Sequence, residues 1–192
     1  IYKEESKMSE NILVLTGSPR RGGNSDTLAD AFIRGAEKNK NKITKVNLAE
    51  KKISGCRACN GCWVSRGNCV VDDDMKELEP LLESADVLVV ATPIYWSMVP
   101  AQVKAPLDRL YEYDPVHGGK HLHIKEAILL TCGETDDAED FMMIKTFFNM
   151  IADFNGMKVR DIIAVPGVNM KGDINGNDAL VQAEKLGLSI GA

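Results

Sequence analysis

The sequence predicts an α/β protein built on an open, parallel β-sheet with helices on both faces. Five apolar runs with the length of buried strands alternate with five segments whose apolar residues recur at helical spacing. This alternation is typical of parallel strands joined by crossover helices. The length of 192 residues suits one domain with a full core. We expect a polar, flexible tail over residues 1–10 and a single domain over residues 11–192.

The first strand and the first helix flank a loop of small residues. Residues 12–15 form a short apolar run between turn residues, as expected of a buried parallel strand. Apolar residues recur at helical spacing over 28–36 and predict the helix. The loop between them, 17–25, reads GSPRRGGNS. A helix that starts after such a loop directs free N–H groups and the positive end of its dipole toward one point.

The side chains of this loop are suited to an anion. Ser18, Asn24 and Ser25 supply short polar groups, and Arg20 or Arg21 supplies a cation. One interpretation is a pocket for a single phosphate group. The other is an ordinary strand-to-helix turn that Asn24 or Ser25 caps. The loop alone leaves both open.

Two familiar phosphate loops do not match. Gly17 and Gly22 have the Walker spacing, but Gly23 stands where that loop requires lysine. The dinucleotide fingerprint G-x-G-x-x-G fails at Pro19. A loop for a terminal monophosphate, as on a mononucleotide, remains.

The other elements follow in order along the chain. Further strands are expected at 42–48, 85–92, 127–131 and 159–165, and further helices around 75–82, 103–110, 141–151 and 179–186. We expect Asp72, Asp73 and Asp74 to cap the second helix, and Pro80 to break or kink it. Pro106 is expected near the start of the third helix. The methionines and phenylalanines of the fourth are expected to fill the core.

Bulk properties exclude several classes of function. A net charge of −5 argues against a general nucleic-acid surface, because phosphate backbones favour basic patches. No apolar run approaches the roughly 20 residues of a membrane-spanning helix. The first ten residues lack the apolar core of a signal peptide. We therefore expect a cytoplasmic protein without nucleic-acid or membrane partners, whose cysteines stay reduced.

Three predicted loops leave the carboxyl ends of strands, where such sheets bind ligands. Loop 17–25 offers phosphate chemistry, and loop 93–98, sequence PIYWSM, offers aromatic and apolar walls. Loop 132–134 offers backbone N–H groups beside a glycine. Together they predict a site for a planar ring system attached to a phosphate.

The three histidines, His117, His121 and His123, lie in one glycine-containing connection over 114–123. They could bind a metal ion together, but a solvated loop is the favoured interpretation.

With these motifs in place, the chain resembles the NADPH-dependent FMN reductase family of flavodoxin-like proteins. The resemblance rests on Gly17-Ser18-Pro19-Arg20 with Gly23-Asn24-Ser25, Cys69 with Asp73-Asp74-Met75, Pro93-Ile94-Tyr95-Trp96, residues 100–105, Leu107-Asp108-Arg109 and Gly172-Asp173-Ile174. It extends over about 11–188. It implies a three-layer, doubly wound fold with a five-stranded parallel sheet in the order 2-1-3-4-5. Pro106 departs from the family, which carries a bulky apolar residue there.

The resemblance implies non-covalently bound FMN and an oxidoreductase that passes electrons from NADH or NADPH through FMN to an acceptor. The cofactor-binding residues that it implies are Ser18, Arg20, Gly23, Asn24, Ser25, Pro93, Ile94, Tyr95, Trp96, Ser97, Met98, Cys132, Gly133 and Glu134. Of these, Ser18, Arg20, Asn24 and Ser25 would hold the phosphate. Residues 93–98 would line the ribityl chain and the ring, and Gly133 with its neighbours would face the polar edge of the ring. No catalytic side chain is named, because the flavin performs the chemistry. Cys132 is expected to be a flavin contact, a redox thiol or, most simply, a small buried residue.

Four cysteines, Cys56, Cys59, Cys62 and Cys69, form the pattern C-x2-C-x2-C-x6-C. Three thiolates spaced by two residues suit a cubane cluster that a fourth completes. Structural zinc more often uses two separated C-x2-C pairs, and disulfides are disfavoured in a reducing compartment. The pattern is similar to that of the iron–sulfur flavoproteins, which implies a [4Fe–4S] cluster beside FMN. Free thiols near the flavin are the alternative.

Three functions follow as hypotheses. The first is an NAD(P)H-dependent FMN oxidoreductase with a small-molecule or protein acceptor, and the second is an iron–sulfur flavoprotein that carries electrons to and from a protein partner. The third, a phosphate-handling hydrolase on the same fold, is disfavoured by the PIYW loop. The resemblance also implies a homodimer or homotetramer, in which Trp63 or Trp96 would cover the flavin of a neighbouring subunit.

Overall fold

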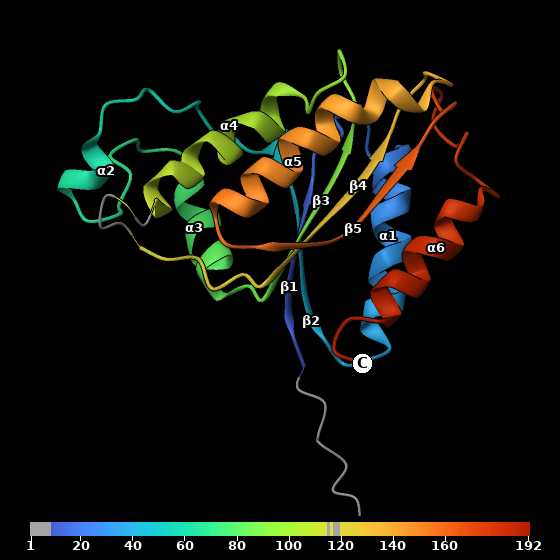
Figure 1. The fold of residues 1–192 in the computed structure, drawn as a ribbon, viewed down its shortest axis with the longest axis horizontal. Helices are drawn as coiled ribbons and strands as arrows, with labels where there is room; N and C mark the ends of the chain where they lie inside the picture. The colour runs from blue at the N-terminus through green and yellow to red at the C-terminus, as the bar shows by residue number, and fades with distance from the viewer. Residues whose placement is uncertain (1–8, 115, 117–119) are drawn as a thin grey trace, which may run out of the picture.

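A computed structural model describes residues 9–114, 116 and 120–192 (Figure 1). Its centre is a parallel sheet of β1 (Asn11–Thr16), β2 (Lys42–Asn47), β3 (Val87–Pro93), β4 (Glu126–Cys132) and β5 (Lys158–Val165). The strand order is β2-β1-β3-β4-β5, which confirms the predicted fold class. Residues 1–8 of the expected tail lie outside the described residues, and Glu10 donates its backbone N–H to Asn41 Oδ1 at 3.0 Å.

Helices cover both faces of this sheet. Helices α1 (Asn24–Glu37) and α6 (Asp178–Leu188) lie on one face, and α3 (Met75–Ser84), α4 (Ala101–Arg109) and α5 (Met142–Phe154) lie on the other (Figure 1). Shorter helices are α2 (Gly61–Val64), η1 (Leu48–Glu50), η2 (Leu110–Tyr113) and η4 (Ala138–Phe141). The strand side chains alternate between two apolar cores, one for each face. Among the described residues, no helix is long and apolar enough to cross a membrane.

Helices α1 and α6 pack with their backbones nearly in contact, through two glycines. A Cβ atom on Gly35 would lie 1.9 Å from the carbonyl oxygen of Glu184, and one on Gly187 would lie 2.0 Å from that of Phe32. No other residue fits at either position without separating the helices. This contact ties α6 to the same helix that follows the 17–25 loop.

The strand order places the reversal point between β1 and β3, which pair in parallel with Thr16 beside Ala91. In open α/β sheets, ligands bind beyond the carboxyl ends of the strands at this point. The loops that follow Thr16, Pro93 and Cys132 all leave this edge. The fold therefore brings together the three loops that the sequence singled out.

Three local expectations were wrong in whole or in part. Pro80 does not break α3, which continues to Ser84 because Leu78 and Leu82 on its apolar face are buried against the sheet. Pro106 lies in the second half of α4, where it is buried, and not near the start. The three methionines of the fourth predicted helix, Met142, Met143 and Met150, are all exposed and do not fill the core, whereas Phe141 and Phe148 are buried as expected.

Candidate functional site

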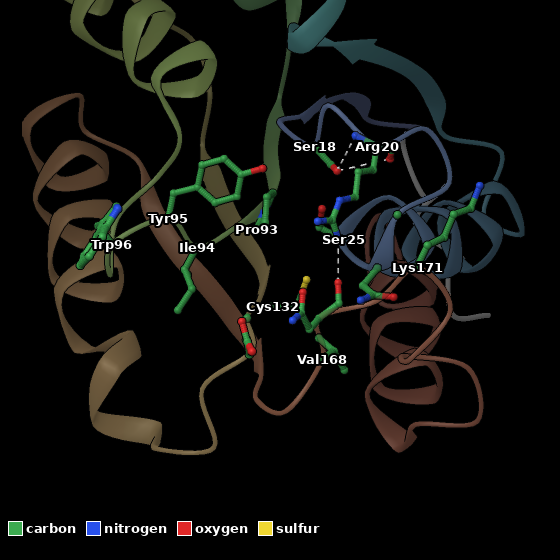
Figure 2. Close-up of a pocket in the computed structure, with 15 residues that line it drawn as sticks. Ser18, Arg20, Ser25, Pro93, Ile94, Tyr95, Trp96, Cys132, Val168 and Lys171 are labelled. Carbon is green, nitrogen blue, oxygen red and sulfur yellow. Dashed lines mark hydrogen bonds between the residues drawn. The ribbon is translucent and has the colours of Figure 1, made fainter.

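A cavity of about 370 Å³ opens at the carboxyl edge of the sheet (Figure 2). Its walls are Ser18, Arg20, Gly23, Asn24, Ser25, Pro93, Ile94, Tyr95, Trp96, Cys132, Gly133, Glu134, Val168, Asn169 and Lys171. All of the predicted cofactor residues except Ser97 and Met98 line it. The sequence analysis missed Val168, Asn169 and Lys171, which come from the loop between β5 and α6. The late Gly172-Asp173-Ile174 motif was the available signal for this loop.

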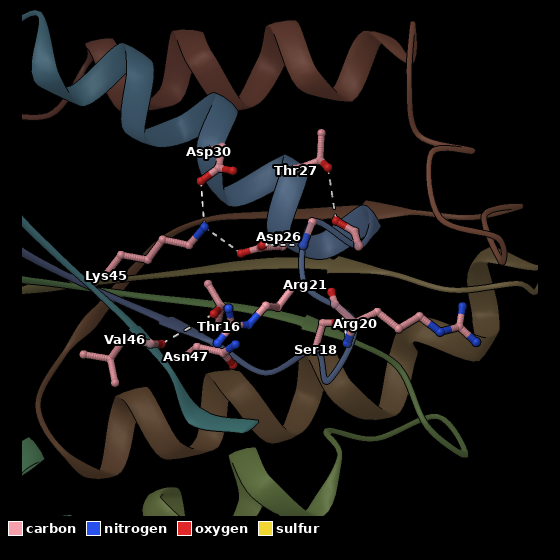
Figure 3. Close-up of polar contacts among 12 residues, drawn as sticks. Thr16, Ser18, Arg20, Arg21, Asp26, Thr27, Asp30, Lys45, Val46 and Asn47 are labelled. Carbon is pink, nitrogen blue, oxygen red and sulfur yellow. Dashed lines mark hydrogen bonds and ion pairs between the residues drawn. The ribbon is translucent and has the colours of Figure 1, made fainter. Parts of the chain in front are cut away.

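The 17–25 loop is held in place by its own helix and by β2. Asp26 Oδ2 accepts the Gly22 N–H at 2.9 Å, while Asp26 Oδ1 pairs with Lys45 Nζ at 2.6 Å (Figure 3). The Thr27 hydroxyl donates to the Gly23 carbonyl at 3.1 Å. Lys45 pairs with Asp26, the acidic residue in the first turn of α1. No unpaired negative charge of Asp26 therefore lies beside the loop.

Two glycines allow the loop to pack tightly. A Cβ atom on Gly17 would lie 2.2 Å from a methyl carbon of Val103 in α4, and Gln102 Nε2 donates to the Gly17 carbonyl at 2.7 Å. A Cβ atom on Gly23 would lie 2.9 Å from the Arg20 carbonyl oxygen. The backbone thus turns sharply at the start of α1, where the free N–H groups of a helix favour an anion.

The side chains of this loop divide into two groups. The Ser25 hydroxyl is buried without a normal hydrogen-bond partner, and Arg20 uses Nη1 to donate to the Asn169 carbonyl at 2.8 Å. Asn24 instead bonds the β5–α6 loop with both of its polar side-chain atoms. Nδ2 donates to the Met170 carbonyl at 2.9 Å, and Oδ1 accepts the Gly172 N–H at 3.1 Å.

Capping of α1 by Asn24 or Ser25 was one of the two interpretations of this loop, and it was wrong. Gly23 is the N-cap residue of α1, and no side chain caps the helix. The first turn of α1 therefore keeps N–H groups that its own side chains do not cap.

The second loop is a strained hairpin turn. Tyr95 and Met98 exchange backbone hydrogen bonds of 2.8 and 3.1 Å, and the two residues between them, Trp96 and Ser97, have φ angles of +51° and +61°. Such angles favour glycine or asparagine, so this turn stores strain beside the cavity. It leaves the Trp96 side chain fully exposed at the cavity wall (Figure 2).

The third loop contributes a rigid backbone and a buried thiol. Gly133 donates its N–H to the Val165 carbonyl at 3.0 Å, and a Cβ atom there would lie 2.5 Å from Ile94. Burial raises the pKa of the Cys132 thiol to about 12, which the neighbouring Ser25 hydroxyl offsets only in part. Cys132 is therefore a neutral thiol at physiological pH, as expected of a small buried residue rather than a redox nucleophile.

The four clustered cysteines lie in the connection between η1 and α3, which contains α2 and is called the cysteine segment below. This segment lies beyond α4 and far from α6 (Figure 1). Cys56 and Cys59 are exposed, and Cys62 and Cys69 are half-buried. Burial raises the pKa of the Cys62 thiol, and the nearby Cys69 adds to this effect. Among the described residues, no group of three or more His, Cys, Asp or Glu side chains is arranged to hold a metal ion. The same statement covers His121 and His123, whereas His117 lies outside the described residues.

A buried ion pair holds both ends of the cysteine segment in place. Arg109 Nη1 lies 3.1 Å from Asp73 Oδ2 and 3.2 Å from the Ser54 carbonyl oxygen. Asp73 also accepts the N–H groups of Ser54 and Met75, at 2.9 and 3.1 Å. Burial alone would raise the pKa of Asp73, but these hydrogen bonds and Arg109 lower it below its usual range. The bond from Met75 bears out the predicted capping role for Asp73 alone, because the N-cap residue Asp74 makes no side-chain cap bond and Asp72 pairs with Lys76.

Glu112 of η2 lies beneath the last cysteine and is only 2% exposed. Its Oε2 accepts the Cys69 N–H at 2.9 Å, and its Oε1 is buried with no hydrogen-bond partner. Burial, reinforced by the charge of Glu79, raises the pKa of Glu112 to about 7. Nearby, the Trp63 ring packs on the Tyr111 ring with centroids 5.2 Å apart. The cysteine segment thus packs on buried polar residues and not on the cavity.

A protein-family comparison places these features in context. The family model for NADPH-dependent FMN reductases matches residues 11–161, which include the three strand-end loops and the four clustered cysteines.

Individual relatives agree with this match. An iron–sulfur flavoprotein of Archaeoglobus fulgidus is 38% identical over 109 residues, covering 56% of this chain and 49% of the relative. The Bacillus subtilis protein YwqN, named as an NAD(P)H-dependent FMN-containing oxidoreductase, is 27% identical over 91% of this chain and 95% of its own. The chain thus spans about half the length of the iron–sulfur flavoproteins that it matches.

The fold also matches solved structures. The NAD(P)H:quinone oxidoreductase from Methanothermobacter marburgensis superposes with a TM-score of 0.73 at 20% identity, over 95% of this chain and 96% of that one. The likeness supports the flavodoxin-like fold.

Proposed function

The chain belongs to the NADPH-dependent FMN reductase family, and from this premise we propose that it is an FMN-dependent oxidoreductase that moves electrons from NADH or NADPH to an acceptor. One observation carries the proposal. A single cavity joins the uncapped start of α1, with Arg20 beside it, to an exposed aromatic turn and a rigid glycine loop. These are the requirements of a ligand with a phosphate at one end and a planar ring at the other.

The residues of the cavity fit FMN. The buried Ser25 hydroxyl has only the Cys132 thiol beside it and can donate to a phosphate oxygen, and Arg20 keeps further N–H donors for the same group. Gly23 allows the ligand to approach the backbone, because a Cβ atom there would already crowd the loop. Tyr95 and Trp96 offer ring surfaces beside the flavin, and Glu134 lies in the loop that would face its polar edge.

Bound FMN supplies the redox chemistry, accepting a hydride from a nicotinamide and passing electrons onward. The residues of the chain orient and enclose it. The turn at Trp96 would place the exposed indole beside the flavin ring, and the start of α1 would favour the negative charge of the phosphate. The Cys132 thiol remains protonated, so we do not assign it a redox role beside the flavin.

The test is the flavin content of the purified chain together with its steady-state activity. We expect bound FMN in a 1:1 ratio and oxidation of NADH or NADPH with quinones or free flavin as acceptors. A colourless chain that neither retains nor binds FMN would contradict the proposal. We further propose one domain over residues 11–192 and a cytoplasmic location. We also propose a homodimer or homotetramer, and sedimentation analysis would test this oligomeric state.

A second candidate function is an electron carrier with FMN and a [4Fe–4S] cluster. It is favoured by the spacing of the four cysteines and by the iron–sulfur flavoprotein of Archaeoglobus fulgidus. The thiols are not gathered into a metal site, so a cluster requires the segment 56–69 to change conformation.

Anaerobic purification with iron and sulfide analysis tests this candidate. About four irons per chain, lost in Cys62→Ser but kept in Cys132→Ser, would support the carrier. Near-zero iron would exclude the cluster. Turnover with small acceptors favours the reductase, whereas activity only with a protein donor or acceptor favours the carrier.

A further inference from the structure

The β5–α6 loop contacts the 17–25 loop at several points, although about 150 residues separate them in the sequence. Arg20 Nη1 donates to the Asn169 carbonyl at 2.8 Å, and Lys171 Nζ donates to the Arg21 carbonyl at 2.8 Å. The Asn24 side chain joins them from the other direction. Figure 2 shows Lys171 beside the loop that carries Ser18 and Arg20. The loop after β5 is therefore part of the wall around the proposed phosphate subsite.

Asn24 uses both of its polar side-chain atoms on the neighbouring loop, and only one N–H of its Nδ2 is left for another acceptor. Its Nδ2 donates to the Met170 carbonyl at 2.9 Å, and its Oδ1 accepts the N–H groups of Gly172 and Ile174 at 3.1 and 3.4 Å. The side chain is also buried. Breaking these bonds would leave the buried Asn24 amide and the buried Ile174 N–H unpaired, which proteins avoid. Asn24 thus acts on the neighbouring loop.

Lys171 is placed to act on the ligand. It lines the cavity, and among the described residues no carboxylate forms an ion pair with it. Its one hydrogen bond within the described part of the chain, to the Arg21 carbonyl, leaves two of its three N–H donors for another acceptor. A Cβ atom on Gly22 would lie 3.3 Å from Lys171 Nζ, so the ammonium rests directly over the 17–25 loop. Asp173 fixes the backbone before it by accepting the N–H groups of Asn169 and Met170, at 2.9 and 2.6 Å.

We infer that Lys171 is a second cation of the phosphate subsite and that Asn24 is a positioning residue that holds the loop carrying it. The ligand class is a phosphomonoester dianion, which two cations and a helix start neutralise better than one cation alone. The inference rests on the proposed function, since it deepens the account of the same cavity. It reassigns Asn24, which the sequence analysis placed among the phosphate ligands.

The test compares FMN with riboflavin, which lacks the phosphate. Fluorescence titration gives both dissociation constants for the wild type, Lys171→Gln and Lys171→Arg, with Lys185→Gln, an exposed lysine of α6, as the charge-matched control. Removing a partly solvated, charge-assisted contact should weaken FMN binding about 5- to 20-fold. We expect riboflavin binding to change less than about twofold, and Lys171→Arg to retain most of the FMN affinity.

A double-mutant cycle tests the role of Asn24. If Asn24 acts through the loop, Asn24→Ala and Lys171→Gln weaken FMN binding non-additively, whereas two independent ligands would give additive losses. An unchanged preference for FMN over riboflavin in Lys171→Gln would overturn the assignment of Lys171, and additive losses would overturn that of Asn24. A wild-type chain that binds neither flavin would instead contradict the proposed function itself.

Discussion

Because of Glu112, we expect the free energy of unfolding of this protein to fall as the pH rises. Its carboxyl is buried beneath Cys69, and its pKa is raised from 4.5 to about 7. The folded chain therefore holds this proton more tightly than the unfolded chain does. Between these two pH values the folded state binds more protons, so the free energy of unfolding decreases as the pH increases and levels off above about pH 7.

The magnitude follows from the same shift. One pKa unit corresponds to about 1.4 kcal/mol, so the rise from 4.5 to about 7 corresponds to roughly 3 kcal/mol. Glu112→Gln removes the titration but keeps an oxygen that can accept the Cys69 N–H. We expect the variant to match the wild type at pH 5 and to be more stable by up to roughly 3 kcal/mol at pH 8.5.

Urea unfolding under reducing conditions, at a fixed flavin concentration, measures this difference. Glu37→Gln on the exposed surface of α1 is the control, and its effect on the free energy of unfolding should be small. A stability difference between Glu112→Gln and the wild type that is the same at both pH values would refute the assignment of a buried, protonated Glu112.

Three further predictions concern packing, strain and thiol reactivity. Gly187→Ala should destabilise the fold by about 3 kcal/mol in denaturant unfolding, because its Cβ atom would clash with the Phe32 carbonyl; wild-type stability would contradict the close packing of α1 and α6. Ser97→Gly should stabilise the chain by about 0.5–1 kcal/mol by relieving a positive φ angle, and a loss of stability would refute strain at this turn. In the native chain at pH 8, iodoacetamide should label Cys56 and leave Cys132 unmodified, as peptide mass spectrometry can show; rapid labelling of Cys132 would contradict its burial.

The sheet and its covering helices could be predicted because local pattern determines them. Each strand is a run of apolar residues, and each long helix has an apolar stripe, so the order of elements follows from the chain alone. The strand-end loops were found for the same reason. The strand order required the family resemblance, since neighbouring strands are not always consecutive in the chain.

The details that depend on distant contacts could not be predicted. Asn24 looks like a phosphate ligand or a helix cap in sequence, but its partners lie about 150 residues away at Met170 and Gly172. Lys171 has no local signal beyond its place before the Gly-Asp-Ile motif. Glu112 lies in a polar stretch that resembles a surface turn, and only tertiary packing buries it. Pro80 is tolerated in α3 because tertiary packing outweighs its local preference.

The central claim is that FMN is bound with its phosphate at the start of α1. The most direct measurement compares the FMN dissociation constants of Arg20→Ala and Arg21→Ala. Arg20 lines the cavity, whereas the adjacent Arg21 is 82% exposed and pairs with Glu50 at 2.8 Å. We predict a loss of about 10- to 100-fold for Arg20→Ala, because a charge-assisted contact is removed, and little change for Arg21→Ala. Equal affinities for the two variants would contradict the account.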